Sequence, residues 1–231
     1  MLAARVRART RTRGAGPATG WREQLHERLV GQVAPGRSFA DAGGMWGAHG
    51  RVAFLAEQAG AGAVTLLDAS PETEEFDAER ERRSSKLRFV RGDINDPAAL
   101  EQVGEHDVVW CSGVLYHAPD PHLTLSRLAS IARETLVIGS ITIPELPGVD
   151  QGCVFYPGLS ERQRAPYAAV APPNAIGLTT PFDPTPERAY ANYWWGITPS
   201  ALRAMVATIG FEVVEAHAPT AFEVHLVARR S

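Results

Sequence analysis

The sequence has little cysteine and no long apolar run. Only two of its 231 residues are cysteines, Cys111 and Cys153, which are too few for a disulfide framework. Cys111 falls in an apolar run typical of a core strand, so we expect a reducing, cytoplasmic compartment. Because no apolar stretch reaches the ~18 residues of a membrane-spanning helix, we expect no membrane partner. At this length, with 45% hydrophobic residues, the chain can bury one sizeable core, which predicts one domain.

Basic charge is concentrated at the N-terminus. Five arginines alternate with small or hydroxyl residues there, without apolar periodicity, and glycine and proline follow: Arg5, Arg7, Arg9, Arg11 and Arg13. We therefore predict that residues 1–20 form a disordered tail; a nucleic-acid-binding arm and a mis-assigned start are the alternatives. Without these arginines, 18 basic and 26 acidic residues remain, a formal balance of −8. An acidic body disfavours a nucleic-acid partner, because binding to phosphates depends on clustered lysine and arginine.

A glycine-dense turn follows the first predicted strand. The strand covers 38–42, the turn 43–50, and a helix is predicted over 50–61. Glycines let backbone amides approach a bulky ligand, and the turn also directs a helix N-terminus at that ligand. Asp68 closes the next predicted strand, 63–68, about 20 residues further on, where an acid commonly binds a ribose diol. Together these features predict a nucleoside-cofactor site.

The details of the turn indicate which nucleoside cofactor binds. The turn has no Gly-x-Gly, and Asp41 precedes Gly43 by two residues, so a carboxylate would repel a pyrophosphate but suit a cation. The pattern Asp41-x-Gly43-x-x-x-Gly47 resembles the first motif of class I S-adenosylmethionine-dependent methyltransferases. Their ligand carries an ammonium, a sulfonium and a ribose, and no phosphate. Met45 departs from the family, since most members have glycine there.

Three further segments resemble this family in the same order. They are 87–96, which contains Gly92-Asp93-Ile94; 106–121, for the fourth strand and its loop; and 135–143, for the fifth strand. The resemblance implies an α/β, doubly wound, Rossmann-like fold. Its seven-stranded sheet has the order 3-2-1-4-5-7-6, with the last strand antiparallel. A helix from Pro199 to before Gly210, with Thr198 as its N-cap, precedes the last two strands.

The resemblance also implies S-adenosylmethionine as the cofactor and places its contacts. The turn would contact the amino-acid part, the end of strand two the ribose, residues 93–94 the adenine, and the start of the loop after strand four the methionine part. The residues at these positions are Asp41, Gly43, Gly44, Gly47, Asp68, Ala69, Asp93, Ile94 and Ser112. For Asp41, Asp68 and Asp93, the alternative to a cofactor contact is that the side chain only caps a strand end or a turn.

Residues 144–197 differ from the rest of the predicted domain, which spans 21–231. They contain nine of the 17 prolines and eight aromatic residues, with little periodicity. Such a stretch after strand five predicts a lid that binds the acceptor, with Tyr193, Trp194 and Trp195 as contacts. Adjacent side chains on an extended segment point opposite ways, so we expect one tryptophan to pack and the other to face the pocket.

His117 is the candidate general base, because the loop after strand four faces the methyl donor in this family and a hydroxyl acceptor must lose a proton. A buried structural histidine is the alternative reading. Tyr116 would lie beside it at the acceptor. His117, Asp120 and His122 superficially resemble metal ligands, but Pro119 and Pro121 break their spacing, so we expect no metal.

A closer resemblance joins residues 113–117 and 193–202 to the tRNA wobble-uridine carboxymethyltransferase branch, in which the residue matching Tyr116 holds a carboxylated cofactor. The short segment before the turn and the acidic body depart from that branch. The expected function is a methyltransferase acting on a small, hydroxyl-bearing, biosynthetic acceptor. The alternatives are an RNA-modifying enzyme of that branch and a non-catalytic subunit that binds the cofactor. The sequence leaves the acceptor and the oligomeric state open.

Overall fold

The computed structural model describes residues 20–168, 182–185 and 191–231. The predicted tail therefore lies outside the described residues except for Gly20, as do parts of the predicted lid. Of the described helices, none is long and apolar enough to cross a membrane.

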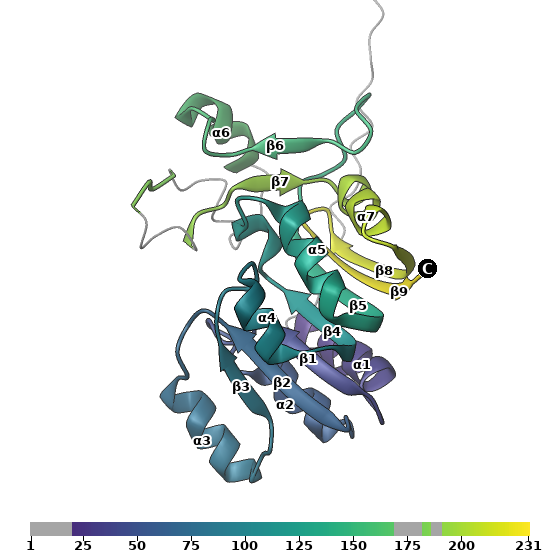
Figure 1. Ribbon diagram of the computed structural model, residues 1–231. Coiled ribbons are helices and arrows are strands. Elements are labelled where there is room, and N and C mark those ends of the chain that lie inside the picture. Colours follow the sequence, from purple (N-terminus) through teal and green to yellow (C-terminus); the bar gives the residue numbers. More distant parts are fainter. Residues whose placement is uncertain (1–19, 169–181, 186–190) are drawn as a thin grey trace, which may run out of the picture.

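A seven-stranded sheet forms the centre of the molecule (Figure 1). Its order is β3-β2-β1-β4-β5-β9-β8, which confirms the predicted topology. The five strands of the first half pair in parallel, and β9 is antiparallel to both β5 and β8. The strand bounds are β1 Ser38–Ala42, β2 Ala63–Asp68, β3 Arg88–Arg91, β4 His106–Ser112, β5 Ala132–Ile141, β8 Phe211–Thr220 and β9 Glu223–Arg230.

Helices cover both faces of the sheet, so the central strands are apolar on both sides. One face packs against α1 and α2, in a core that includes Leu29, Phe54 and Trp110, and the other packs against α4, α5 and α7. Residues 108–111 of β4 are accordingly almost fully buried. The helix bounds are α1 Trp21–Val33, α2 Arg51–Gln58, α3 Glu74–Arg83, α4 Pro97–Val103, α5 Pro121–Ile131 and α7 Pro199–Thr208.

Local sequence signals fix the ends of α7 as expected. The Thr198 hydroxyl accepts the Ala201 amide at 3.2 Å, Pro199 is the first helical residue, and Gly210 has a φ of 81° just beyond the end. Helices α4 and α5 begin in the same way, on Asp96 and Asp120, each followed by proline. These caps satisfy amides that would otherwise lack partners.

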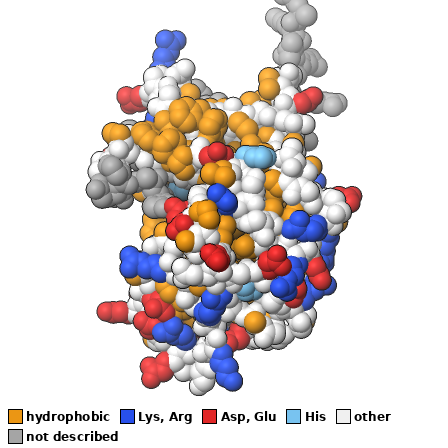
Figure 2. All heavy atoms as spheres, viewed as in Figure 1, with side chains coloured by type: hydrophobic (Ala, Val, Ile, Leu, Met, Phe, Trp, Pro, Cys, Tyr) orange, Lys and Arg blue, Asp and Glu red, His pale blue; other side chains and the backbone are white. Residues whose placement is uncertain are grey.

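Residues 144–197 contain regular elements that the sequence pattern did not predict. Strands β6 Cys153–Phe155 and β7 Trp195–Ile197 form a small antiparallel sheet, and α6 Glu161–Ala168 lies beside it (Figure 1). Hydrophobic side chains gather over this upper part of the molecule in Figure 2. Two hydrogen bonds tie it to the loop after β4: the Trp194 amide donates to the Tyr116 carbonyl at 2.8 Å, and the Trp195 indole donates to the Pro119 carbonyl at 2.9 Å.

Candidate active site

The turn after β1 needs its glycines. Gly43 has a φ of 83°, and a Cβ there would collide with the Val114 side chain. At Gly44, a Cβ would collide with the carboxylate of Asp41, which lies directly beneath the turn. Gly47 also has a positive φ, of 66°, and faces open space. Backbone atoms are therefore the surface that this turn offers to a ligand.

Asp68, at the end of β2, holds the turn in place. Its Oδ2 accepts the Met45 amide at 2.8 Å, and its Oδ1 accepts the Ser70 amide at 2.8 Å. The Met45 side chain is fully buried in the core, so it anchors the turn where the family has glycine. Each carboxylate oxygen keeps a second lone pair, which leaves Asp68 able to accept a ribose hydroxyl.

Asp41 is a buried acid with one oxygen that has no partner among the described residues. The side chain is 2% exposed, and that oxygen is Oδ2. Burial, and then the charge of Asp68, raise the pKa of Asp41 to about 7. A cation beside it would stabilise the ionised form. Two carboxylates beneath an open glycine turn thus fit a cationic nucleoside and do not fit a pyrophosphate.

The other predicted cofactor contacts follow β2, β3 and β4, which meet at the same edge of the sheet because the strands are parallel. Asp93 accepts the Asn95 amide at 2.7 Å and so caps its turn. Ile94 lies beside Gly43, Ala69 directly follows Asp68, and Ser112 is the last residue of β4. The topology therefore brings together the predicted residues, and their contacts with a cofactor stay predictions.

His117 lies in a row of aromatic rings. It ends a short 3₁₀ helix, Leu115–His117, and its ring is 4.3 Å from Tyr116 and 4.8 Å from Tyr193, centroid to centroid. Its Nδ1 is 2.8 Å from the Asn192 carbonyl oxygen, so Nδ1 must carry the proton and donate it. Burial lowers the pKa of His117. The ring is thus neutral, with the lone pair on Nε2.

Tyr116 and Tyr193 stack at 4.7 Å, and their hydroxyl groups are hydrogen-bonded to each other. Burial and the neighbouring Tyr193 raise the pKa of Tyr116. The phenol is therefore protonated at neutral pH and cannot itself serve as a base. This supports a contact or positioning role for Tyr116 beside His117.

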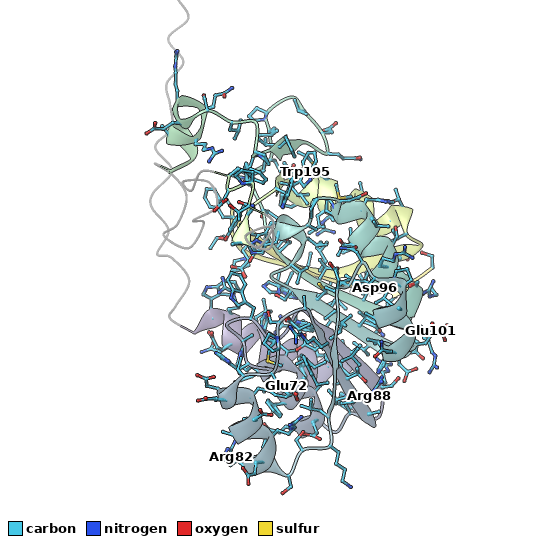
Figure 3. All side chains as sticks on the ribbon, turned by 60° about the vertical axis from the view of Figure 1, so that its left-hand side comes forward. Glu72, Arg82, Arg88, Asp96, Glu101 and Trp195 are labelled. Carbon is cyan, nitrogen blue, oxygen red and sulfur yellow. The ribbon has the colours of Figure 1, made fainter. Side chains whose placement is uncertain are left out.

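The two tryptophans of the insertion have different surroundings. Trp195, labelled in Figure 3 at the upper part of the molecule, packs against the core next to α5 and α7 and lies 4.9 Å from Phe155. Trp194 makes an edge contact with Phe182 at 4.9 Å, and its indole nitrogen is buried without a partner among the described residues. A role for either in binding an acceptor stays a prediction.

A buried group of hydrogen-bonded polar side chains, which the sequence did not predict, begins on β9. His225 is fully buried, and its Nε2 is 3.0 Å from Glu223, which Arg22 of α1 binds at 2.8 and 2.5 Å through two nitrogens. Burial raises the pKa of Glu223, but hydrogen bonds from His225 and Arg22 outweigh it and bring the pKa to about 2. The ring of His225 lies against Gly139 of β5, where a Cβ would also collide with Ser112. The signal was two polar residues alternating with valine and leucine in one strand.

The suspected metal ligands have structural partners instead. Asp120 caps α5, and His122 contacts the Thr208 hydroxyl at 2.9 Å. Within the described ranges, no three His, Cys, Asp or Glu side chains gather closely enough to hold an ion.

Comparisons with known proteins agree with this architecture. Residues 45–135 match the methyltransferase domain family. The magnesium protoporphyrin IX methyltransferase from Synechocystis PCC 6803, solved with bound SAH, superposes with a TM-score of 0.60 at 19% identity, over 91% of this chain and 84% of that one. An O-methyltransferase family protein from Burkholderia thailandensis has a TM-score of 0.60 at 15% identity, and the match covers 90% of this chain and 56% of that one.

The N-terminal domain of EvdMO1, solved with SAH and D-fucose, has a TM-score of 0.57 at 18% identity, and the match covers 90% of this chain and 82% of that one. No curated protein sequence matches the chain. The sheet order and these neighbours define the fold as that of the class I S-adenosylmethionine-dependent methyltransferases.

Proposed function

We propose that this protein is an S-adenosylmethionine-dependent methyltransferase that methylates a hydroxyl group of a small molecule. The observation that carries the proposal is the pair of buried carboxylates, Asp41 and Asp68, beneath an open glycine turn at the carboxyl edge of the parallel strands. The neighbours solved with SAH support the same cofactor.

The chain's own residues divide the work of binding. Asp68 accepts the ribose hydroxyls, the glycine turn admits the amino-acid part, and Asp41 supplies negative charge beneath it. Residues 93–94 would contact the adenine, and Ser112 the methionine part. When bound, the cofactor supplies an electrophilic methyl group on a sulfonium.

His117 removes the acceptor's proton. Its Nδ1–H is committed to the Asn192 carbonyl, so Nε2 is the nitrogen that can accept a proton. With the cofactor held by Asp41, Asp68 and the glycine turn, the deprotonated hydroxyl oxygen would be the nucleophile for its methyl group, and the demethylated product would be the leaving group. The protein contributes positioning and exclusion of water, to which the aromatic rings around His117 are suited.

A small acceptor is supported by two features. The rings next to His117 are apolar, and the chain's net formal charge is −3, which gives no general attraction for a polyphosphate. The named acceptors of structural neighbours, magnesium protoporphyrin IX among them, are also small molecules.

Calorimetry and labelled methyl transfer test the proposal. We expect S-adenosylmethionine and its demethylated product to bind in a 1:1 complex. The Asp68→Asn variant loses the charge and one of the two oxygens that accept the Met45 and Ser70 amides, and we expect it to bind about 10- to 100-fold more weakly. Tight binding of a nicotinamide dinucleotide without binding of S-adenosylmethionine would contradict the proposal.

With labelled cofactor and a metabolite extract of the source organism, we expect label in small molecules. Label in tRNA, with steep salt dependence of binding, would instead support the RNA-modifying alternative. Cofactor binding without transfer to either fraction would favour the non-catalytic subunit.

A further inference from the structure

Trp46 is held in the glycine turn with its side chain in solvent. It is 68% exposed, the most exposed of the large hydrophobic side chains in the described part of the chain. Its backbone is fixed on both sides, by the Met45 amide bonded to Asp68 and by the left-handed Gly47. The fixed turn therefore holds the indole in a defined position, with apolar ring surface that a ligand can reach.

The ring of Trp46 is the exposed end of the aromatic row around His117. Its centroid is 5.9 Å from that of His117, with the planes at 72°. Beyond His117 lie Tyr193 and Tyr116, which are at least partly buried and pack on one another. Trp46 therefore connects the cofactor turn to the row and is the member with a face open to a ligand.

The polar atoms of this row are largely committed. The Tyr116 hydroxyl is bonded to that of Tyr193, and Nδ1 of His117 is bonded to Asn192. Nε2 of His117, the second O–H of the tyrosine pair and the indole N–H of the exposed Trp46 are the polar groups that the row has left to offer. A row of aromatic rings with so few polar groups suits a ligand with a flat, apolar body and a hydroxyl to place, whereas a sugar needs more hydrogen-bonding partners.

We propose that Trp46 determines acceptor specificity, by stacking a flat, hydroxyl-bearing aromatic ring whose hydroxyl points to Nε2 of His117. This inference rests on the proposed function and narrows its acceptor to planar phenols. Offset or edge-to-face packing of aromatic rings provides the attraction.

The test uses the full chain with 2-naphthol and quercetin as probes, and cyclohexanol and D-fucose as non-planar comparisons. We expect methyl transfer to a planar probe. Trp46→Ala should raise the KM for it about 10- to 100-fold, and Trp46→Phe should restore most of the loss. The Kd for S-adenosylmethionine should stay within about twofold in both variants. Leu123→Ala, which shortens an exposed apolar side chain on α5, is the matched control and should change neither constant.

Three outcomes would overturn the inference. One is an unchanged KM in Trp46→Ala, and a second is a loss confined to cofactor affinity, which would make Trp46 a cofactor contact. The third is a wild-type protein that binds the cofactor but methylates only the non-planar probes or none of the four. Failure of the proposed function itself looks different, because the wild-type protein would then not bind S-adenosylmethionine. Because the Trp46 ring is exposed, we expect both variants to melt within a few degrees of wild type.

Discussion

At the scale of single residues, the two acids beneath the glycine turn differ in how the protein satisfies them. Asp68 accepts two backbone amides, whereas Asp41 keeps a buried oxygen without a partner in the described structure. The sequence placed both acids at strand ends, since a carboxylate after an apolar run is visible in the letters. It could not show that Asp41 is the costly one, because that depends on the burial of its side chain and on the charge of Asp68 close to it in three dimensions.

The raised pKa of Asp41 predicts a pH effect on stability. Its pKa in the folded state is about 7, against an ordinary value of 3.8 for an aspartate side chain, so the folded state binds the proton more tightly. Between these values, wild type should lose up to ~1.4 kcal/mol per pH unit relative to Asp41→Asn as the pH rises. Urea unfolding of both proteins at pH 5 and pH 8 measures the difference, and a parallel pH dependence would contradict it. Saturating S-adenosylmethionine should reduce the wild-type loss, because a cation favours ionised Asp41.

His117 gives a second test at this scale. In His117→Asn, the amide nitrogen can still donate to the Asn192 carbonyl, but the basic Nε2 is gone. We expect kcat to fall about 10²- to 10⁴-fold, with cofactor affinity and melting temperature close to wild type. His122→Ala, on the exposed side of α5, is the control. If His117 only packs, kcat of the folded protein will not change, and catalysis by positioning alone becomes the preferred account.

At the scale of elements, the sequence predicted the seven strands, their order and the caps of α7. The strands and the caps rest on short-range signals, which are apolar runs of four to six residues, Thr198 before Pro199, and Gly210 after the helix. The strand order rests on the resemblance to the methyltransferase family. The small β6–β7 sheet was missed, because its three-residue strands carry no usable period and depend on the Tyr156 and Ile143 side chains, which pack against Gly196 of β7. The tie between α1 and β9 was missed too, since Arg22 and Glu223 are 201 residues apart.

The ion pair between Arg22 and Glu223 is predicted to contribute to the free energy of unfolding. Arg22→Ala leaves the carboxylate of Glu223 largely buried with His225 alone as a partner, and because Arg22 is 40% exposed we expect a cost of about 1–2 kcal/mol. The control is Arg28→Ala on the same helix, which breaks an exposed pair with Glu215 and should cost less than about 0.5 kcal/mol. The stabilisation from Glu223 is present above its unfolded pKa, near 4.5, and is lost as the pH falls toward 2. Equal costs for the two variants in thermal melts would show that burial of Glu223 does not matter.

At the scale of the whole molecule, the two halves of the sheet have separate tasks. The parallel half carries the cofactor turn and the acids, and the segment between β5 and α7 supplies aromatic rings above it. The family of folds was predictable from the order of the motifs, whereas the aromatic row was not, since Trp46, His117 and Tyr193 are brought together only by the crossing of the chain. The resemblance to the tRNA-modifying branch stays a prediction.

The arginine-rich N-terminus gives a test on the whole chain. Deleting residues 1–14 should leave the melting temperature and the activity on a small acceptor unchanged, because this sequence has no apolar pattern with which to pack. Differential scanning calorimetry and the methyl-transfer assay measure both. A drop of several degrees would show that these residues dock on the domain, and a loss of activity on RNA alone would support the tRNA alternative.

The position of β9 has a consequence for synthesis on the ribosome. Among the strands of this sheet β9 is the last in chain order, yet it lies inside the sheet, and β8, which precedes it, pairs with β9 and with no other strand of the sheet. A nascent chain that has released β1 to β8 therefore already has the turn and its acids, but until β9 emerges β8 has no strand to pair with and Arg22 of α1 lacks Glu223. Loss of β9 would thus remove an interior strand rather than trim an edge, and would leave the backbone edge of β5 unpaired and open to aggregation.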